Sequence, residues 1–339
     1  MSDSVQQQAP AGQAPSSQAP SSPVPRVRAG RGPVGRGGAP GQPESRRRRK
    51  RNDGAWPWLF VAPLAAGIVV FYLWPILQTA WYSLTTFGVF GGATFSGLDN
   101  YRQLVADAAL YRALGNTLLY TAIVLLGIPI AVYLASLLNL PDLRFASFYR
   151  VLYFLPYVAM PTAIAMVWRI IYNGDFGVLN YVLGLVGIEG PYWISTPGAA
   201  MVAVALVGLW SSLGFSMIVL GAGLKNIPPD LYEAAELDGA SRWNQFRSIT
   251  VPLLTPSISF LLIITVISSF QLFDLLYAIL GSTNPTLPRS MSLVYFFYQA
   301  GFVQNDKGYA AAIAMVILLI IGVATAVQFR FQRRWVHGG

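Results

Sequence analysis

Six apolar runs limit the possible folds most strongly, because each is long enough to cross a bilayer as a helix, which takes about 20 residues. No charged residue occurs from Ala113 to Leu138 or from Tyr309 to Phe329. Only 11% of all residues are charged, against about 25% in soluble domains. The sequence therefore predicts an all-α membrane protein with six transmembrane helices, at 58–84, 113–138, 149–172, 198–222, 257–280 and 309–330.

Five prolines fall inside these runs, namely Pro63, Pro75, Pro129, Pro156 and Pro161. A proline removes one backbone donor, but neighbouring helices in a membrane can satisfy the carbonyl group that it frees. We therefore expect kinked transmembrane helices.

Residues 1–55 have a different composition, rich in Pro, Gly, Ala, Ser and Gln. Such a segment cannot bury enough apolar surface to offset its ordering entropy, so we expect a disordered tail. It ends in the basic run 46–51, which is compatible with a lipid-binding flank, a nucleic-acid patch or a twin-arginine export signal. We favour the flank, without a nucleic-acid partner, because a polybasic segment beside a span fixes orientation and attracts anionic lipid.

The distribution of Lys and Arg predicts the orientation in the membrane. With the N-terminus inside, 18 of the 23 basic residues lie on the cytoplasmic side and 5 outside; without the tail, the numbers are 8 and 5. We therefore expect both termini in the cytoplasm, a membrane domain over 56–335 in the plasma membrane, and a long cytoplasmic loop at 223–256.

Several kinds of enzyme are excluded by the residues that the chain lacks. It has no cysteine, and its single histidine, His337, lies near the C-terminus, which argues against a catalytic triad, a thiolate metal site or a histidine-rich metal centre. None of its three lysines follows a glycine, so it has no P-loop for ATP. We expect neither an enzyme nor a resident metal or cofactor.

The loop at 223–256 is a polar island with recognisable helix signals. Asp230 and Glu233, three residues apart, predict a capping box that starts a short helix, and Gly239 suits the left-handed position that ends it. Ser241 can cap a second short helix, which Pro252 closes. The second helix carries Arg242, Trp243, Phe246 and Arg247. The loop either protrudes to bind another protein or only packs on its own helical bundle.

The spacing within this loop carries a family resemblance. Glu233, Ala234 and Ala235, then Gly239 four residues on, then Ile249-x-x-Pro252 resemble the EAA motif in permeases of binding-protein-dependent ATP-binding cassette importers, with Val251 where the family usually has Leu. The chain is most similar to carbohydrate-importer permeases of the maltose and glycerol-3-phosphate branch. Further similar segments are 97–101, 116–118, 153–157 and 269–274, whereas 281–285 departs from the pattern.

The resemblance implies a MetI-like fold and a division of labour over residues 57–335. Two such permeases would form a pore, two ATPase subunits would bind ATP and grip the cytoplasmic loops, and an extracytoplasmic binding protein would deliver a sugar. On this basis the residues expected to couple to the ATPase are Glu233, Ala234, Ala235, Asp238, Gly239, Ile249 and Pro252.

Candidates for the substrate pathway are polar and aromatic residues of the fourth and fifth runs. Asp274 is the one acid within a predicted span, which by default suggests function. The candidates are Trp210, Ser211, Phe215, Ser216, Phe270, Gln271 and Asp274. Helix packing is the alternative for the aromatic residues, and pairing with a neighbouring helix is the alternative for Asp274. We expect Asn116 to form an interhelical hydrogen bond.

Two hypotheses therefore remain. The first is the membrane subunit of an ATP-driven sugar importer, and the second is a secondary transporter or membrane scaffold whose loop merely packs. A proton- or sodium-coupled carrier usually needs several ionisable groups near the midplane, and only Asp274 is available, which favours the first. Because the only Lys or Arg in the outer half of a predicted span is Arg169, at the end of the third run, a neutral sugar is the expected substrate.

Overall fold

A computed structural model describes residues 56–87, 92–140 and 143–335. The predicted disordered tail and its basic run lie outside these residues. By its contacts the chain divides into Met1–Pro57 and Trp58–Gly339, and the helical fold belongs to the second unit.

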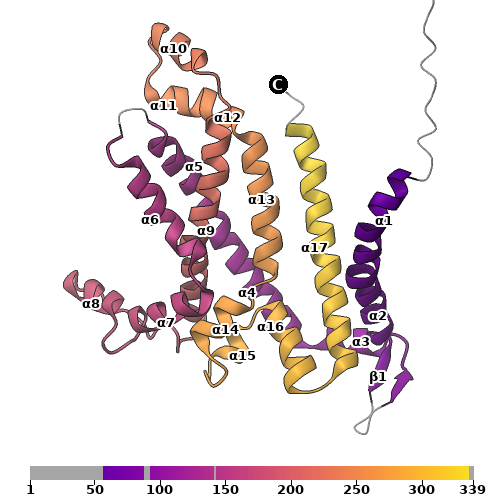
Figure 1. Cartoon of the computed structure of the whole chain (residues 1–339). Coiled ribbons are helices and arrows are strands. Elements are labelled where there is room, and N and C mark those ends of the chain that lie inside the picture. Colours follow the sequence, from indigo (N-terminus) through magenta and orange to yellow (C-terminus); the bar gives the residue numbers. More distant parts are fainter. Residues whose placement is uncertain (1–55, 88–91, 141–142, 336–339) are drawn as a thin grey trace, which may run out of the picture. The chain divides into compact units, whose positions relative to one another are not determined.

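The first half of the fold is helical apart from one hairpin (Figure 1). Its elements are α1 (Trp56–Ile68), the π-helical turn η1 (Val69–Leu73), α2 (Trp74–Tyr82), β1 (Thr85–Phe87), β2 (Ala93–Phe95), α3 (Asp99–Ala106), α4 (Ala108–Leu125), α5 (Gly127–Leu138), α6 (Ala146–Val158), α7 (Pro161–Ile171) and α8 (Val178–Leu185). The strands are antiparallel, with Thr85 opposite Phe95.

The second half is also helical. Its elements are α9 (Ala199–Leu224), α10 (Asp230–Leu237), α11 (Arg242–Gln245), η2 (Phe246–Thr250), α12 (Val251–Leu253), α13 (Thr255–Phe270), α14 (Asp274–Leu280), α15 (Leu287–Ser290), α16 (Leu293–Tyr298), η3 (Gln299–Val303) and α17 (Lys307–Trp335).

Among the described residues, four helices are long and apolar enough to cross a membrane, and two bent helix pairs raise the number of candidate spans to six. The four are Leu59–Tyr82, Ala108–Leu138, Ala199–Leu224 and Lys307–Gln332. They confirm helices at the first, second, fourth and sixth predicted runs. The third run is not one straight helix, because α6 and α7 meet at 99°. The bend falls at Ala159 and Met160, and a residue that precedes a proline, as Met160 does, disfavours the helical conformation.

The bend in the third run agrees with the expected kinks, whereas the fifth predicted run, 257–280, was wrong as a single helix. Helix α13 ends at Phe270, and three residues separate it from α14. The buried hydroxyl of Ser292 donates a hydrogen bond to the carbonyl oxygen of Leu272 within this break. That bond satisfies a backbone group that the broken helix leaves without its usual partner.

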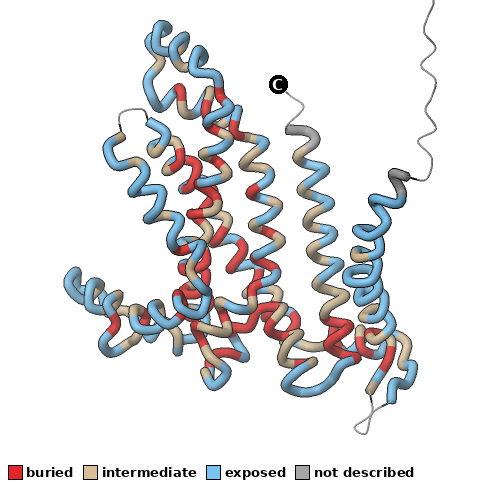
Figure 2. Tube along the Cα trace, in the orientation of Figure 1, coloured by how far each residue is buried: buried red, intermediate tan, exposed pale blue. Residues whose placement is uncertain are grey.

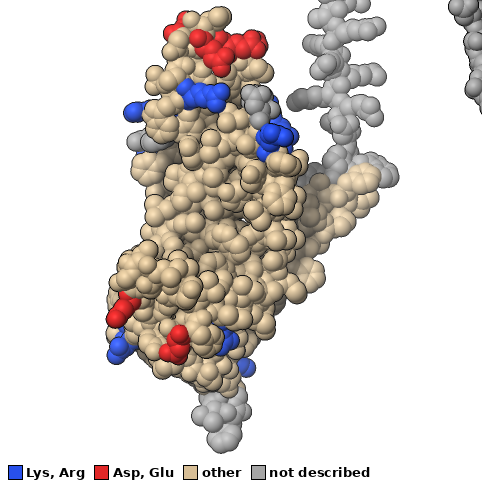
Figure 3. Space-filling model, turned by 90° about the vertical axis from the view of Figure 1, so that its left-hand side faces the viewer, with Lys and Arg blue, Asp and Glu red and all other residues tan. Residues whose placement is uncertain are grey.

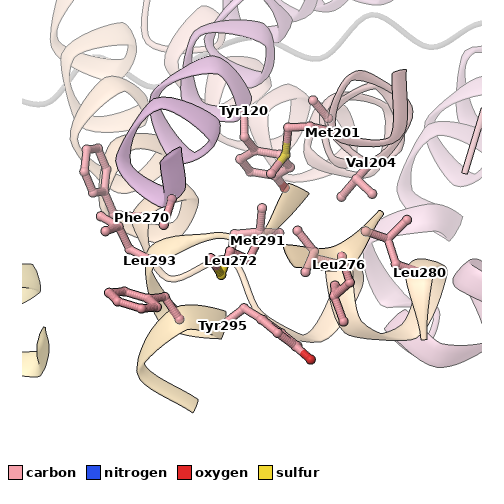
Figure 4. Close-up of a cluster of buried hydrophobic side chains, with 14 of the residues drawn as sticks. Tyr120, Met201, Val204, Phe270, Leu272, Leu276, Leu280, Met291, Leu293 and Tyr295 are labelled. Carbon is pink, nitrogen blue, oxygen red and sulfur yellow. The ribbon is translucent and has the colours of Figure 1, made fainter. Parts of the chain in front are cut away.

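Helix α9 lies at the centre of the packing and contacts α4, α5 and α6. Its buried face is lined with small and branched residues such as Ala203 and Val204 (Figure 2). A Cβ atom at Gly214 would lie 2.5 Å from the carbonyl oxygen of Tyr153, so only glycine lets α6 approach this closely. Ala203 and Val204 belong to a cluster of buried side chains that joins α4, α9 and α13 to α14 and α16, part of which is shown in Figure 4.

The first span has a different environment. Helix α2 packs against α17, whereas the outer faces of α1 and α2 are exposed and apolar (Figure 2). Exposed apolar faces of this length are expected where a helix contacts lipid. Asn100 fixes the hairpin that follows, because its amide donates to the carbonyl oxygens of Ser83 and Thr85, each at 2.9 Å.

Candidate functional site

The polar loop forms a helix over the predicted stretch, but its N-terminus differs from the prediction. Pro229 is the N-cap residue of α10, and no side chain caps the helix. Asp230 and Glu233 therefore stand one position too far into the helix to form the expected capping box. Instead, the carbonyl oxygen of Pro229 accepts hydrogen bonds from the backbone of Tyr232 and Glu233. Both acids still lie in the first turn, where the helix dipole favours negative charge.

The C-terminus of α10 confirms the prediction that Gly239 ends this helix in the left-handed conformation. Its φ is +76°, and its backbone donates to the carbonyl oxygen of Glu236 at 3.0 Å. Ala240 donates to the carbonyl oxygen of Ala235 at 2.9 Å. These two bonds are the pair that defines a Schellman motif, with Asp238 as the C-cap residue. A Cβ atom at Gly239 would meet no atom of the chain within 4 Å, so the glycine borders open space.

The second part of the loop attaches to the bundle. Ser241 caps α11 as predicted, because its hydroxyl accepts from the backbone of Asn244 at 3.3 Å. Phe246 stacks on Trp243 at 5.4 Å and packs edge-on against Tyr133 of α5 at 6.1 Å. Ile249 is half-buried in the turn η2.

Helix α10 itself is exposed. The structure describes all eight of its residues, and none of them is buried. Leu237 is 91% exposed, which is unusual for a leucine at the tip of an otherwise acidic helix. The acids of this tip are Asp230, Glu233, Glu236 and Asp238. Figure 3 shows acidic side chains gathered at this end of the molecule.

Ala234 is exposed, and Ala235 is partly buried on the same helix. Pro252 is also exposed and occupies the first turn of α12. The structure thus separates the predicted coupling residues into an exposed group on α10 and its turn, and a group in η2 and α12 at the base of the loop.

The substrate-pathway candidates lie in two places. On α9, Trp210 packs edge-on against Trp168 at 5.5 Å, and Phe215 stacks on Tyr157 at 5.3 Å. Ser216 is buried and donates to the carbonyl oxygen of Ser212 at 3.0 Å. The hydroxyl of Ser211 is buried without a partner among the described residues.

The other candidates surround the break after α13. Phe270 is buried in the apolar cluster of Figure 4, which supports packing as its role. Gln271 and Asp274 are exposed. The prediction that Asp274 lies inside a membrane-spanning helix was wrong, because it begins the short helix α14 after the break. In the part of the chain that the structure describes, Asp274 forms no ion pair, and no hydrogen bond or ring contact joins it to the candidates of α9.

Sequence reasoning missed a cavity of about 250 Å³. The helices α14, α15 and α16 that line it lie at the end of the bundle opposite α10 (Figure 1). Its walls come from α14, α15, α16, η3 and the connection 281–286. The available signal was the aromatic segment 295–298, which follows the fifth apolar run and precedes the sixth. The length and apolarity of this segment did not by themselves predict a function for it.

Comparison with known proteins agrees with this architecture. The family model "Binding-protein-dependent transport system inner membrane component" matches residues 104–337. The probable ABC transporter permease protein YesP of Bacillus subtilis is 34% identical over 88% of this chain and 97% of its own length. The lactose transport system permease protein LacF of Rhizobium radiobacter is 35% identical over 85% and 98%. The sn-glycerol-3-phosphate transport system permease protein UgpA of Yersinia pestis is 31% identical over 83% and 95%.

The same fold occurs in a solved structure. A bacterial ABC transporter involved in the import of the acidic polysaccharide alginate matches 83% of this chain and 96% of the solved chain, with a TM-score of 0.72 at 23% identity. The fold is therefore the helical MetI-like permease fold, in a multi-pass inner-membrane protein. Since the family model covers most of the chain and the relatives match nearly from end to end, this chain belongs to the family of inner-membrane components of binding-protein-dependent transport systems.

Proposed function

We propose that this chain is the membrane-spanning permease subunit of an ATP-driven carbohydrate importer. Three relatives are named for the transport of lactose, sn-glycerol 3-phosphate and arabinooligosaccharides, which supports a carbohydrate or a related polyol derivative as the substrate class. Within this class we favour neutral sugars. The chain transports and does not catalyse, and ATP is bound by separate subunits.

The observation that carries the proposal is the exposed helix α10 with its glycine turn. Leu237 and the small side chain of Ala234 offer a surface that a groove on an ATPase subunit can cover. Glu233 and Asp238 add charges for partner cations at the rim. Ile249 and Pro252 lie at the base of the loop, where they pass movement of α10 on to α13.

The proposed orientation places α10 in the cytoplasm. Figure 1 shows the C-terminal end of α17 at the same end of the bundle as α10, which supports a cytoplasmic end for this helix as well. The excess of Lys and Arg supports a cytoplasmic N-terminus.

The proposed assembly contains a second homologous permease, two ATPase subunits and an extracytoplasmic binding protein. One solved relative of this fold is a bacterial alginate ABC transporter in complex with an alginate pentasaccharide-bound periplasmic protein. For this chain, Gln271 and Asp274 are the pathway candidates that remain exposed and free to contact a passing sugar. Trp210, Ser211, Phe215 and Ser216 form a second, more enclosed group on α9.

A matched pair of glycine variants tests the coupling role. Gly187 ends α8 in the same Schellman geometry as Gly239, with a φ of +77°, and a Cβ atom there also meets nothing within 4 Å. Gly239→Asp and Gly187→Asp therefore place equal strain on equal turns. We expect Gly239→Asp to insert normally but to abolish sugar uptake and co-purification of the ATPase, whereas Gly187→Asp keeps both. Undiminished uptake in Gly239→Asp would overturn the proposal.

A further inference from the structure

The cavity at the outer end is lined by uncharged side chains. The polar and aromatic residues of its lining include Tyr277, Ser282, Asn284, Tyr295, Tyr298 and Gln299. Its volume of about 250 Å³ approaches the roughly 300 Å³ at which small-molecule sites begin. A ligand held here has hydrogen-bonding groups and aromatic faces available, but no counter-charge.

Three tyrosine rings form one wall. The ring centroids of Tyr277, Tyr295 and Tyr298 lie 5.9 to 6.2 Å from one another. Phe273 supports them from behind, with its centroid 5.0 Å from that of Tyr298 and 5.5 Å from that of Tyr277. Rings packed in this way lose little further freedom when a ligand binds, so the wall is preorganised.

The hydroxyl groups of these tyrosines are available to a ligand. None of the three makes a hydrogen bond to another described residue, and none is a buried oxygen without a partner, so all three are open to solvent. Figure 4 shows the hydroxyl of Tyr295 pointing away from the apolar cluster that holds its ring. The side chain of Gln299 and the hydroxyl of Ser282 likewise make no hydrogen bond within the described chain.

Other residues keep the cavity in shape. The amide of Asn284 donates to the carbonyl oxygen of Ile194 at 2.8 Å, and its oxygen accepts from the backbone of Thr286 at 2.9 Å. The hydroxyl of Thr117 in α4 accepts from the backbone of Leu293 at 3.0 Å. The polar groups that build the wall are thus satisfied, and those that face the cavity are not.

Interfacial anchoring is the other common use of tyrosine in a membrane protein. An anchor extends its ring towards the headgroups, whereas Tyr295 is only 6% exposed and the three rings pack against one another. Aromatic faces beside free hydroxyl and amide groups suit a ligand with C–H faces and many hydroxyl groups. The absence of charge among the lining residues selects against an anion.

We propose that this cavity is an outer saccharide subsite, at which a neutral sugar docks before it reaches Gln271 and Asp274. Tyr277 lies one helical turn after Asp274 on α14, so the subsite adjoins the break where those two side chains are exposed. This inference rests on the proposed function as a carbohydrate importer.

Saturation-transfer NMR on the assembled importer in nanodiscs tests the subsite, with lactose and arabinotriose as neutral probes and glycerol 3-phosphate as the charged one. Tyr298→Phe and Gln299→Ala each remove one hydrogen-bonding group while the ring wall stays in place. We expect signal from at least one neutral probe and not from glycerol 3-phosphate. Each variant should weaken neutral-sugar binding by roughly fivefold, the factor for one lost hydrogen bond.

Tyr181→Ala is the matched control, because Tyr181 lies on α8 outside the cavity and is 70% exposed. It should bind like the unmodified chain. Three results would overturn the subsite. The first is no signal from either neutral sugar, and the second is neutral-sugar binding by Tyr298→Phe and Gln299→Ala equal to that of the unmodified chain. The third is a signal from glycerol 3-phosphate equal to that from the neutral sugars. Gly239→Asp, measured as the inserted permease without its ATPase, separates this result from the proposed function, because it should lose uptake while it keeps the sugar signal.

Discussion

The hydroxyl of Tyr232 lies 2.9 Å from Oγ1 of Thr250, and this hydrogen bond joins the exposed helix α10 to the turn η2 that leads into α13. Thr250 is buried, with 4% of its surface exposed. Among the described residues, no other side-chain hydrogen bond connects α10 to the rest of the chain. The contact is therefore positioned to transmit a displacement of α10 to the membrane helices.

Breaking this bond should weaken coupling without weakening assembly. We expect Tyr232→Phe and Thr250→Val each to weaken the contact between α10 and η2 by roughly 1 kcal/mol, the contribution of one hydrogen bond. The double variant should weaken this contact no more than either single variant does. The measurement is sugar taken up per ATP hydrolysed, with ATPase co-purification as the control for assembly. Additive losses in the double variant would show that the two hydroxyl groups act independently.

The close approach of α6 to α9 depends on Gly214. In Gly214→Ala the new methyl group would lie 2.5 Å from the carbonyl oxygen of Tyr153 and 3.1 Å from Cα of Phe154, so the helices must separate. We expect a loss of stability of roughly 1–3 kcal/mol, measured by thermal unfolding in detergent.

Gly221→Ala on the same helix is the control for Gly214→Ala. No atom lies within 4 Å of a Cβ atom at Gly221, so this change should leave stability unchanged or raise it by up to about 1 kcal/mol. If the two alanine variants unfold at the same temperature, the close packing of α6 on α9 does not contribute to the stability of the protein.

Asn116 anchors the segment around α15 to α4. Its amide donates to the carbonyl oxygens of Arg289 at 2.8 Å and Met291 at 3.0 Å. The expected interhelical bond is therefore a bond from α4 to the backbone around the end of α15. Asn116→Ala should leave both carbonyl groups unpaired and cost roughly 1–3 kcal/mol.

Hydrogen exchange measures the effect of Asn116→Ala most directly. We expect faster exchange in residues 286–293, while Leu118→Ala, which truncates a side chain that is 50% exposed, leaves the exchange unchanged. Equal protection in Asn116→Ala and the unmodified chain would show that the two bonds do not stabilise the segment.

Asp274 is expected to contact the sugar during transport. Asp274→Asn should lower uptake by roughly tenfold or more, since a hydrogen bond to a charged group contributes about 1.5–3 kcal/mol. Assembly with the ATPase should not change. Asp99→Asn is the control, because Asp99 is exposed and pairs only with Arg102 at the surface. Uptake equal to that of the control would remove Asp274 from the pathway.

Sequence reasoning succeeded where a local property decides the structure. The apolar length of Ala199–Leu224 is sufficient to predict a spanning helix, and a glycine after Leu237 and Asp238 suits the left-handed conformation that ends α10. It failed where a distant residue decides. In the break between Phe270 and Asp274, a backbone carbonyl oxygen accepts a hydrogen bond from the hydroxyl of Ser292. No residue near the break in the sequence predicts that contact.

The capping box failed for a different reason. The sequence Pro228-Pro229-Asp230 offers two possible starts for the helix, and the helix begins one residue earlier than the box requires, with Pro229 as its N-cap residue. The cavity lined by Tyr277, Tyr295 and Tyr298 could not be predicted, because these tyrosines come from α14 and α16, and only the folded connection between the two helices brings the rings together.

The most direct test of the account is a crosslink from Leu237, whose side chain is 91% exposed. The chain contains no cysteine, so Leu237→Cys can carry a benzophenone maleimide as a unique label. Val186→Cys, at a position 70% exposed at the end of α8, is the control. The account predicts a photocrosslink to the ATPase subunit from position 237 and none from position 186. Absence of the ATPase crosslink at 237 in a complex that still imports sugar would contradict it.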